Sequence, residues 1–388
     1  MPADVVASND TSPFAGAWVG SWDGRLNTVL VVESVDAAGS AKVVYAVAGS
    51  PGRFAANWAR RDAEIRGDTM TVTGAGAAIR FTHSGSGRLR AVFGQGGGFA
   101  VLSRSSLQEL RNPAASLPWL AGQSVRLDTA LVENGQAVML EAVIYRPPGN
   151  GPFPLAVVNH GSTGRGTEPA LARQTWSNPW LADLLNQRGW IVAFPQRRGR
   201  GKSDGLYDEG FSRDRSKGYT CEVKRSLAGA QRALDDLDAA ITALRARPDV
   251  SEAPMLIAGD SRGGVLSVAY AGLHPQVVTG AVNFVGGWVA EGCRSAATIN
   301  QSLFGRGTGF GGPTLWVYGQ DDPYYAIAHS RENFQVFAAG GGQGEFVEVS
   351  VPGSGNGHWA MAVPTLWMPA LTGWLDRLPG ADGAPVKR

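Results

Sequence analysis

One serine of this 388-residue chain stands in a pattern that could make it a nucleophile. An apolar run, Met255–Ala258, leads directly into Gly259-Asp260-Ser261-Arg262-Gly263-Gly264, and a helix-compatible stretch follows. A Gly-x-Ser-x-Gly sequence between a strand and a helix forms a tight turn that lifts the serine hydroxyl clear of the backbone. The helix after the turn also directs its positive end toward that hydroxyl. The pattern predicts that Ser261 attacks an electrophilic carbon.

A serine nucleophile needs a histidine base and an acid that orients the histidine. In this strand–turn–helix context the three follow one another in the order serine, acid, histidine. His274 lies at the end of the predicted helix, and His329 lies inside another predicted helix. His358 lies in a glycine-rich loop, 353–359, after a predicted strand. We therefore predict that His358 is the base.

Two aspartates compete for the role of the acid. The predicted strand Leu315–Tyr318 ends in Gly319-Gln320-Asp321-Asp322-Pro323. Asp322 has the usual offset of three residues from the glycine, whereas Asp321 could cap the following helix. We prefer Asp322 as the acid and keep Asp321 as the alternative.

A further loop could stabilise negative charge on the reacting oxygen. The predicted strand Leu155–Asn159 ends in His160-Gly161-Ser162-Thr163-Gly164. We predict an oxyanion hole formed by the main-chain N–H groups of Ser162 and Arg262, because such donors stabilise the developing oxyanion. The side chain of His160 is expected to brace this loop.

The elements that position these residues alternate between strands and helices after about residue 122. In the clearest predicted helix, Glu222–Arg247, five apolar residues fall on one face. Strands separated by helices predict a mostly parallel sheet with right-handed crossovers. Because ligands bind at the carboxyl ends of such strands, the serine, acid and histidine loops fall where chemistry is expected.

The first quarter of the chain has a different pattern. Short β-like runs broken by Gly and Asp predict a small antiparallel β-barrel or sandwich over residues 12–105. Trp18 and Trp22 alternate with small residues, as in the first strand of a barrel whose core they fill. Residues 106–121 contain Pro113 and Pro118 and are predicted to be a linker. A catalytic domain is predicted at 122–380.

Residues from about 122 to 380 resemble the α/β-hydrolase superfamily, in its dienelactone-hydrolase and prolyl-oligopeptidase-like branch. Five landmarks match in order, and they are Asn159–Gly161, Pro195–Gly205, Gly259–Gly264, Gly319–Pro323 and Gly357–Trp359. The resemblance implies an α/β-hydrolase fold with a Ser-His-Asp triad. Dienelactone hydrolases proper have a cysteine where this chain has Ser261. The N-terminal 110 or so residues lie outside the resemblance.

Composition excludes several other classes of protein. The formal net charge is +2, from 35 Lys and Arg against 33 Asp and Glu, which gives no general attraction to nucleic acid. No apolar run is long enough for a membrane-spanning helix. No His, Cys, Asp or Glu cluster has metal-ligand spacing, so we expect neither a metal nor another cofactor.

These observations predict a cofactor-free serine hydrolase that cleaves small or aromatic carboxylic esters through an acyl-enzyme intermediate. The aromatic walls of its pocket are expected to be Trp288, Tyr324, Tyr325 and Trp359, because each follows a strand end or neighbours a triad residue. One alternative is a serine peptidase of the prolyl-oligopeptidase type, although about 100 residues of short strands cannot form the propeller usual in that family. Others are a thioesterase or lactonase with the same triad, or a binding protein led by the N-terminal β domain. That domain could also form a homodimer.

The only two cysteines, Cys221 and Cys293, fall in loops expected on the same rim of the sheet. They form either a disulfide, which is slightly favoured, or two buried free thiols. A disulfide indicates a periplasmic or secreted protein, and free thiols a cytoplasmic one. The first ten residues lack the basic and apolar regions of a signal peptide, so export would require a leader outside this sequence.

Overall fold

A computed structural model describes residues 4–22, 26–47, 57–74, 77–84, 88–94, 98–111, 122–147, 149–351 and 356–378. The chain forms two compact units. The first comprises Met1–Gln123 together with Asn178–Gln187, and the second comprises Ser124–Ser177 and Arg188–Arg388.

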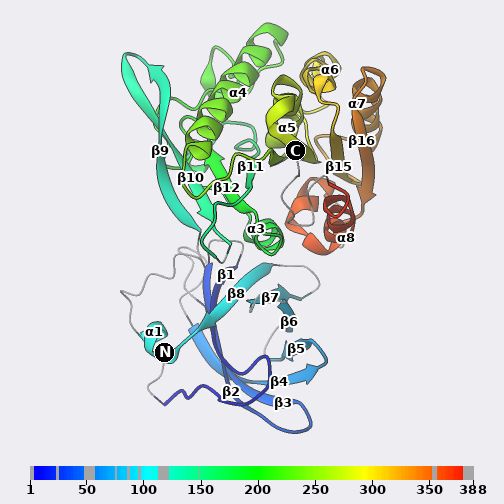
Figure 1. The fold of residues 1–388 in the computed structure, drawn as a ribbon. Coiled ribbons are helices and arrows are strands. Elements are labelled where there is room, and N and C mark those ends of the chain that lie inside the picture. The colour runs from blue at the N-terminus through cyan, green and yellow to red at the C-terminus, as the bar shows by residue number, and fades with distance from the viewer. Residues whose placement is uncertain are drawn as a thin grey trace. The chain divides into compact units, whose positions relative to one another are not determined.

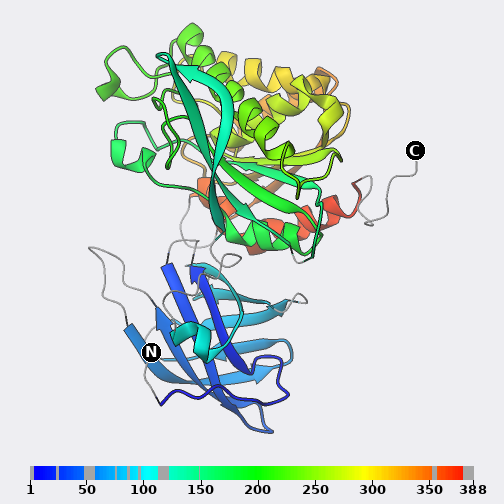
Figure 2. The ribbon, with the colours of Figure 1, turned by 60° about the vertical axis from the view of Figure 1, so that its left-hand side comes forward.

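The first unit contains a closed barrel of eight strands (Figures 1 and 2). The strands are β1 (Gly16–Trp22), β2 (Leu26–Val35), β3 (Ser40–Val47), β4 (Asn57–Arg66), β5 (Thr69–Val72), β6 (Ile79–Ser84), β7 (Arg88–Phe93) and β8 (Phe99–Ser105). Each strand pairs antiparallel with the next, and β8 returns to pair with β1. The sequence predicted a barrel or a sandwich, and the closed barrel is the one observed.

Side chains that alternate along the strands fill the barrel interior. Trp18 is fully buried, and its indole N–H donates to the carbonyl oxygen of Phe14 at 2.8 Å. Trp22 is also buried and donates to the hydroxyl of Tyr45 at 2.7 Å. These two tryptophans therefore belong to the barrel core, as the alternation predicts.

Two short helices complete the first unit. Helix α1 (Leu107–Arg111) follows β8 and lies within the predicted linker, of which residues 112–121 lie outside the described residues. Helix α3 (Pro179–Asn186) comes from the middle of the chain. Its buried Asp183 forms ion pairs with Arg88 at 2.7 Å and with Arg90 at 3.0 Å.

The second unit contains a sheet of eight strands in the order β16-β15-β14-β13-β11-β12-β10-β9. The strands are β9 (Gln123–Glu133), β10 (Gln136–Tyr145), β11 (Leu155–Asn159), β12 (Ile191–Gln196), β13 (Met255–Asp260), β14 (Val278–Phe284), β15 (Pro313–Gly319) and β16 (Gln343–Val349). Strands β11 to β16 pair in parallel, whereas β10 pairs antiparallel with β12. The carboxyl ends of β11, β13 and β15 therefore face the same edge.

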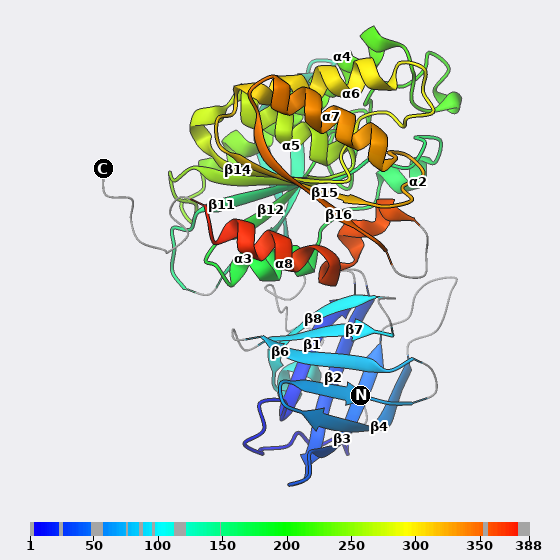
Figure 3. The same ribbon diagram turned by 90° about the vertical axis from the view of Figure 1, so that its right-hand side faces the viewer.

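Helices cover both faces of this sheet (Figure 3). The helices of the second unit are α2 (Pro169–Ala172), α4 (Val223–Arg245), α5 (Arg262–Leu273), α6 (Ala296–Gly305), α7 (Ile327–Ala339) and α8 (Pro364–Leu375). Helices α5, α6 and α7 lie on one face, and α8, drawn in red, lies on the other. The long helix predicted at Glu222–Arg247 is confirmed as α4, whose buried face includes Leu234, Leu237 and Ile241.

Candidate active site

Ser261 lies in the turn between β13 and α5, where the sequence predicts the nucleophile. Its φ angle is +53°, in the left-handed region that costs a serine about 1–3 kcal/mol. Main-chain hydrogen bonds hold the residue there, because its N–H donates to Phe284 O and its carbonyl oxygen accepts from Gly264 N, both at 2.9 Å. Such strain persists where the surroundings enforce it, and it is typical of functional turns.

The glycines of the motif let backbone segments touch beneath the serine. A Cβ at position 263 would lie 2.1 Å from the carbonyl oxygen of Asn159. A Cβ at position 259 would lie 2.1 Å from the carbonyl oxygen of Gly263. No side chain fits at either position, so the sequence Gly-x-Ser-x-Gly is what lets α5 begin directly against the end of β11.

The loops after β15 and β16 bring a carboxyl group to the predicted base. His358 lies in the short 3-10 helix Gly357–Ala362, and its Nδ1 is 2.8 Å from Asp322 Oδ2. The other carboxyl oxygen, Asp322 Oδ1, accepts the N–H groups of Tyr324 at 2.8 Å and Tyr325 at 3.1 Å. Asp322 is buried, and these bonds fix its orientation toward His358.

Asp321 occupies a different place from Asp322. Its φ angle is +57°, and its side chain is exposed. Its carbonyl oxygen accepts the N–H of Gly357 at 3.3 Å, so the backbone of Asp321 joins the two loops. A Cβ at position 319 would lie 2.1 Å from Gly357 O, which means that these loops pack backbone against backbone.

Two charges act on the imidazole of His358. Burial alone would lower its pKa, but the hydrogen bond and charge of Asp322, together with the charge of Asp260, raise the pKa above its usual value. Asp260 precedes Ser261, and burial raises the pKa of its own carboxyl group to about 6. The imidazolium form that a proton transfer would create is therefore stabilised in place.

The loop after β11 contacts the nucleophile directly. A Cβ at Gly161 would lie 3.1 Å from the Cβ of Ser261, so residues 160–163 pass close beside the serine. Arg262 is the first residue of α5, and first-turn N–H groups have no partner within their own helix. Ser162 and Arg262, whose main-chain N–H groups are the predicted oxyanion donors, therefore lie on the two segments that pack together at Ser261.

His160 braces this loop, as the sequence predicts. It is fully buried, its Nε2 accepts the N–H of Arg197 at 3.2 Å, and its carbonyl oxygen accepts from the Arg197 guanidinium at 3.0 Å. Burial, and next the charges of Arg197 and Arg200, lower the pKa of His160 well below its usual value. The ring is therefore neutral and structural.

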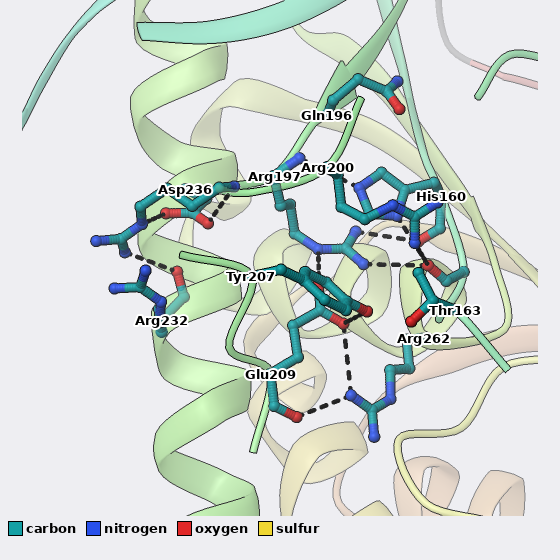
Figure 4. Close-up of polar contacts among 12 residues, drawn as sticks. His160, Thr163, Gln196, Arg197, Arg200, Tyr207, Glu209, Arg232, Asp236 and Arg262 are labelled. Carbon is teal, nitrogen blue, oxygen red and sulfur yellow. Dashed lines mark hydrogen bonds and ion pairs between the residues drawn. The ribbon is translucent and has the colours of Figure 1, made fainter. Parts of the chain in front are cut away.

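A buried ionic network joins Glu209 to Arg197 and to Arg262, the residue after the nucleophile, and the sequence did not predict it (Figure 4). Glu209 Oε1 is 2.6 Å from the Arg197 guanidinium, and Glu209 Oε2 is 3.4 Å from that of Arg262. Burial alone would raise the pKa of Glu209, but the two arginines outweigh burial and lower it. Glu209 lies in the segment Asp208–Tyr219, in which Arg213, Arg215 and Lys217 are a charge run typical of a solvated loop, yet Glu209 is buried. The aromatic residues of this segment are the signal that could have indicated burial.

The side chain of Arg262 connects this network to Trp288, in the loop that follows β14. Its guanidinium donates to the carbonyl oxygen of Trp288 at 2.9 Å and lies 4.2 Å from the centre of the Trp288 ring. The guanidinium also lies 3.6 Å from the centre of the Tyr219 ring. A disulfide joins Cys221 and Cys293, so a covalent bond ties together the two segments that enclose Arg262. The disulfide alternative is thus the one observed.

The four aromatic residues predicted to wall the pocket have different environments. Trp288 is buried, and its indole N–H donates to Ser226 O at 3.0 Å. The rings of Tyr324 and Tyr325 lie 4.7 and 5.6 Å from the ring of His358. Tyr325 is buried, whereas Tyr324 is 41% exposed and Trp359 is 59% exposed. Tyr324 thus presents open aromatic surface next to His358, and Trp359 is exposed at the following position in the chain.

Among the described residues, no group of three or more His, Cys, Asp or Glu side chains is placed to hold a metal ion. No helix in the described part of the chain is long and apolar enough to cross a membrane.

Comparisons with known proteins point to the same class of fold. A family model described as serine aminopeptidase, S33 matches residues 175–291. Comparison with curated proteins found no match. Together with the strand order and the serine turn, the family match decides the fold. The second unit is an α/β-hydrolase domain. The family match also indicates a hydrolase.

Several solved structures are similar to parts of the chain. Est1E of Butyrivibrio proteoclasticus, solved with ferulic acid, is 15% identical over 64% of this chain and 98% of its own, with a TM-score of 0.42. The esterase Pf2001 of Pyrococcus furiosus is 16% identical over 66% of this chain and 90% of its own, with a TM-score of 0.45. The acylaminoacyl peptidase of Pyrococcus horikoshii is 12% identical over 93% of this chain and 70% of its own, with a TM-score of 0.47.

The network predicts how stability responds to loss of the Glu209 charge. Glu209→Gln leaves two buried guanidinium groups without their carboxylate, so the free energy of unfolding should fall by about 3–5 kcal/mol near pH 7. Because the folded-state pKa of Glu209 is lowered, the stabilisation is present above its unfolded pKa of about 4.3 and is lost as the pH falls through the lower folded value. The difference between variant and wild type should therefore shrink in acid.

Urea unfolding from pH 7 to pH 3 measures this difference. Glu64→Gln is the matched control, because Glu64 pairs with Arg66 on the surface and should contribute less than about 1 kcal/mol. Equal stability of Glu209→Gln and wild type at pH 7 would contradict the assigned role of the network.

Proposed function

We propose that this protein is a serine hydrolase that cleaves carboxylic esters through an acyl-enzyme intermediate. The observation that carries the proposal is the 2.8 Å hydrogen bond between His358 Nδ1 and Asp322 Oδ2, in a domain that also holds Ser261 at a φ angle of +53°. A histidine oriented by a buried carboxylate is the base that a serine nucleophile requires. Ser261, Asp322 and His358 are the proposed triad.

Each group has a definite task in this mechanism. Ser261 Oγ attacks the ester carbonyl carbon while His358 Nε2 accepts the hydroxyl proton, and Asp322 stabilises the imidazolium through Nδ1–H. The main-chain N–H groups of Ser162 and Arg262 bind the oxyanion of the tetrahedral intermediate. The imidazolium then gives its proton to the leaving alcohol oxygen, which leaves Ser261 acylated. Water, deprotonated by His358, attacks the acyl group and restores the serine.

We further propose that the preferred esters are small or aromatic. The support is the exposed ring of Tyr324, 4.7 Å from the ring of His358, and the exposed Trp359, which follows His358 in the chain. An aromatic ring of the substrate gains about 0.5–1.5 kcal/mol from each such ring contact beyond its burial. Aryl and aromatic-acid esters should therefore be better substrates than esters of long acyl chains.

A peptidase is the second candidate, and the family match to serine aminopeptidases is the observation that favours it. The described strands of the first unit close into a single barrel, which is not the propeller of the prolyl-oligopeptidase type. Comparison of kcat/KM on p-nitrophenyl acetate, p-nitrophenyl benzoate, p-nitrophenyl laurate and an aminoacyl p-nitroanilide separates the candidates. We expect the benzoate to rank first. Preference for the anilide would establish a peptidase, and preference for the laurate a lipase.

Substitution of the nucleophile tests the reaction itself. Ser261→Ala should reduce kcat on p-nitrophenyl acetate by at least about 10⁴-fold, because the covalent route is lost. It should also abolish labelling by a fluorophosphonate, read by intact-protein mass spectrometry. Ser216→Ala, at an exposed serine, is the control and should behave as the wild type. Retained turnover in Ser261→Ala would refute the proposal.

The electrostatics of His358 predict the pH dependence. Hydrolysis needs the neutral imidazole, so kcat/KM should fall in acid with a midpoint above about pH 6.5, the ordinary pKa of histidine, because the pKa of His358 is raised. Asp260→Asn removes one of the negative charges that raise this pKa and should move the midpoint to lower pH. Stopped-assay pH profiles of both proteins measure the shift. An unchanged midpoint in Asp260→Asn would contradict the assigned charge effect.

We propose that the protein works in an oxidising compartment, in the periplasm or outside the cell. The support is the Cys221–Cys293 disulfide, whose cysteines are 72 residues apart, because disulfides persist where the environment is oxidising. Native cells lysed in the presence of an alkylating reagent should yield the disulfide-linked peptide pair. Two alkylated thiols would instead indicate the cytoplasm. In the purified protein, replacement of both cysteines by serine should lower the free energy of unfolding by about 2–5 kcal/mol.

A further inference from the structure

Tyr219 is in contact with both segments that supply the proposed oxyanion donors. Its hydroxyl oxygen accepts the main-chain N–H of Thr163 at 3.2 Å and lies 3.0 Å from Thr163 Oγ1. The centre of its ring lies 3.6 Å from the guanidinium carbon of Arg262. Thr163 directly follows Ser162 in the chain. One side chain therefore reaches the neighbour of the first donor and the side chain of the second.

The hydrogen bonds of the Tyr219 hydroxyl have a definite direction. The hydroxyl of Tyr207 donates to Glu209 Oε2 at 3.1 Å (Figure 4), and burial raises the pKa of Tyr207, so this phenol keeps the proton that it donates. The Tyr207 oxygen is therefore the acceptor in its 2.6 Å contact with the Tyr219 hydroxyl. Tyr219 donates its only proton there, which leaves its oxygen free to accept both the N–H and the hydroxyl of Thr163.

Backbone contacts hold Tyr219 against the loop after β11. Its N–H donates to the carbonyl oxygen of Arg165 at 3.2 Å, and a Cβ at Gly218 would lie 2.0 Å from the same oxygen. A Cβ at Gly166 would lie 3.1 Å from Tyr219 Cζ, so the tyrosine ring lies directly against this loop. The N–H of Gly166 donates to Thr163 O at 3.0 Å and closes the turn. The loop is therefore fixed to Tyr219 through its main chain as well as through the hydroxyl.

We propose that Tyr219 is a positioning residue of the oxyanion hole. This inference rests on the proposed serine-hydrolase function. The hydroxyl binds the N–H of Thr163 and thereby directs the preceding N–H, that of Ser162, toward the oxyanion of the tetrahedral intermediate. The ring restrains the side chain of Arg262, and with it the first residue of α5. Tyr219 itself does not touch the substrate in this scheme, and it acts through the two main-chain donors.

The pattern of hydrogen bonds along the loop supports this role. Thr163 is only 4% exposed, and its N–H is bound by the Tyr219 hydroxyl. The N–H of Ser162 has no acceptor among the described residues. One N–H of the loop is thus occupied while its neighbour remains available to a substrate oxygen. A phenylalanine would keep the ring against Arg262, but the buried N–H of Thr163 would lose its acceptor, and an unpaired buried group is costly.

Tyr219→Phe tests the proposal, since it removes the hydroxyl and keeps the ring. We expect kcat on p-nitrophenyl acetate to fall about 10- to 10²-fold, because a displaced donor stabilises the oxyanion less than an aligned one, with KM within about twofold. The acid midpoint of kcat/KM should not move, because the His358–Asp322 bond remains. Tyr270→Phe is the matched control and should keep the wild-type kcat, because its hydroxyl donates to Asp238 at 3.1 Å and takes no part in these contacts.

A trifluoromethyl ketone separates an effect on the oxyanion hole from a general loss of structure. Attack of Ser261 Oγ on the carbonyl carbon of phenyl trifluoromethyl ketone gives a hemiketal whose oxyanion occupies the hole, while the serine proton moves to His358. The Ki of this inhibitor should rise in Tyr219→Phe by about the factor by which kcat falls, as expected of a transition-state analogue. A loss of folded enzyme would lower kcat and leave Ki unchanged, which would contradict the proposal.

Thr163→Val tests the other end of the contact. Valine keeps the N–H and the approximate volume of threonine but loses its hydroxyl, so kcat should fall by about threefold or more, yet less than in Tyr219→Phe. The double variant should lose little more than Tyr219→Phe alone, as expected for residues that act through one contact, and losses that multiply would overturn the proposal. If Tyr219→Phe does not fold, as judged by thermal melting, an unchanged kcat in Thr163→Val would overturn it.

The outcomes separate this inference from the proposed function. If wild type hydrolyses the ester through Ser261 and Tyr219→Phe keeps both kcat and the inhibitor Ki within about twofold, Tyr219 does not position the oxyanion hole. A loss confined to KM, or one accompanied by a shifted acid midpoint, would also overturn the inference. If wild-type protein is neither active nor labelled by a fluorophosphonate, the proposed function fails and the inference fails with it.

Discussion

The candidate active site depends on backbone segments that touch with no side chain between them. The end of β11 meets the start of α5 where Gly263 lies against Asn159, and the loop after β15 meets the loop after β16 where Gly319 lies against Gly357. A single methyl group at either contact would lie 2.1 Å from a carbonyl oxygen and would force the segments apart. Because a hydrogen bond weakens steeply beyond its ordinary length, the 2.8 Å bond between His358 and Asp322 requires that second contact. The alignment of the proposed triad is therefore set by main-chain packing.

Around Arg262, buried ion pairs hold the chain segments together, a role that apolar side chains usually have in a protein interior. Arg262 follows the nucleophile, and its guanidinium lies against the rings of Tyr219 and Trp288 and forms an ion pair with Glu209. The cost of burying these ions is met by their mutual attraction and by hydrogen bonds to carbonyl oxygens, which have a fixed direction. The disulfide between Cys221 and Cys293 adds a covalent restraint to the same two segments. The first residue of α5, a proposed oxyanion donor, is thereby anchored through its own side chain.

The sequence predicted those parts of the structure that local patterns determine. The strand Met255–Ala258, the turn at Ser261 and the helix at Glu222–Arg247 each combine apolar periodicity with residues that end an element, and all three are present. Strand β4 has no such local signal, because it carries Arg60, Arg61, Asp62 and Glu64, which strands usually lack, and it directs only Ala63 and the partly buried Ile65 to the core. The pairing of Glu209 with Arg197 and Arg262 could not be predicted, because it joins segments 12 and 53 residues apart and no local pattern records it. The same holds for α3, whose Asp183 meets Arg88 in the barrel unit.

The central claim is that Ser261 becomes acylated with the help of His358 and Asp322, and rapid-quench mass spectrometry tests it most directly. Wild-type protein mixed with excess p-nitrophenyl benzoate should release a burst of nitrophenol that approaches one equivalent wherever deacylation is slower than acylation. Acid-quenched protein should then carry one benzoyl group on the peptide that contains Ser261. Asp322→Asn should slow formation of this adduct by about 10⁴-fold, as loss of the orienting carboxylate does in a triad. Benzoylation of another residue, or an adduct that forms at the wild-type rate in Asp322→Asn, would contradict the account.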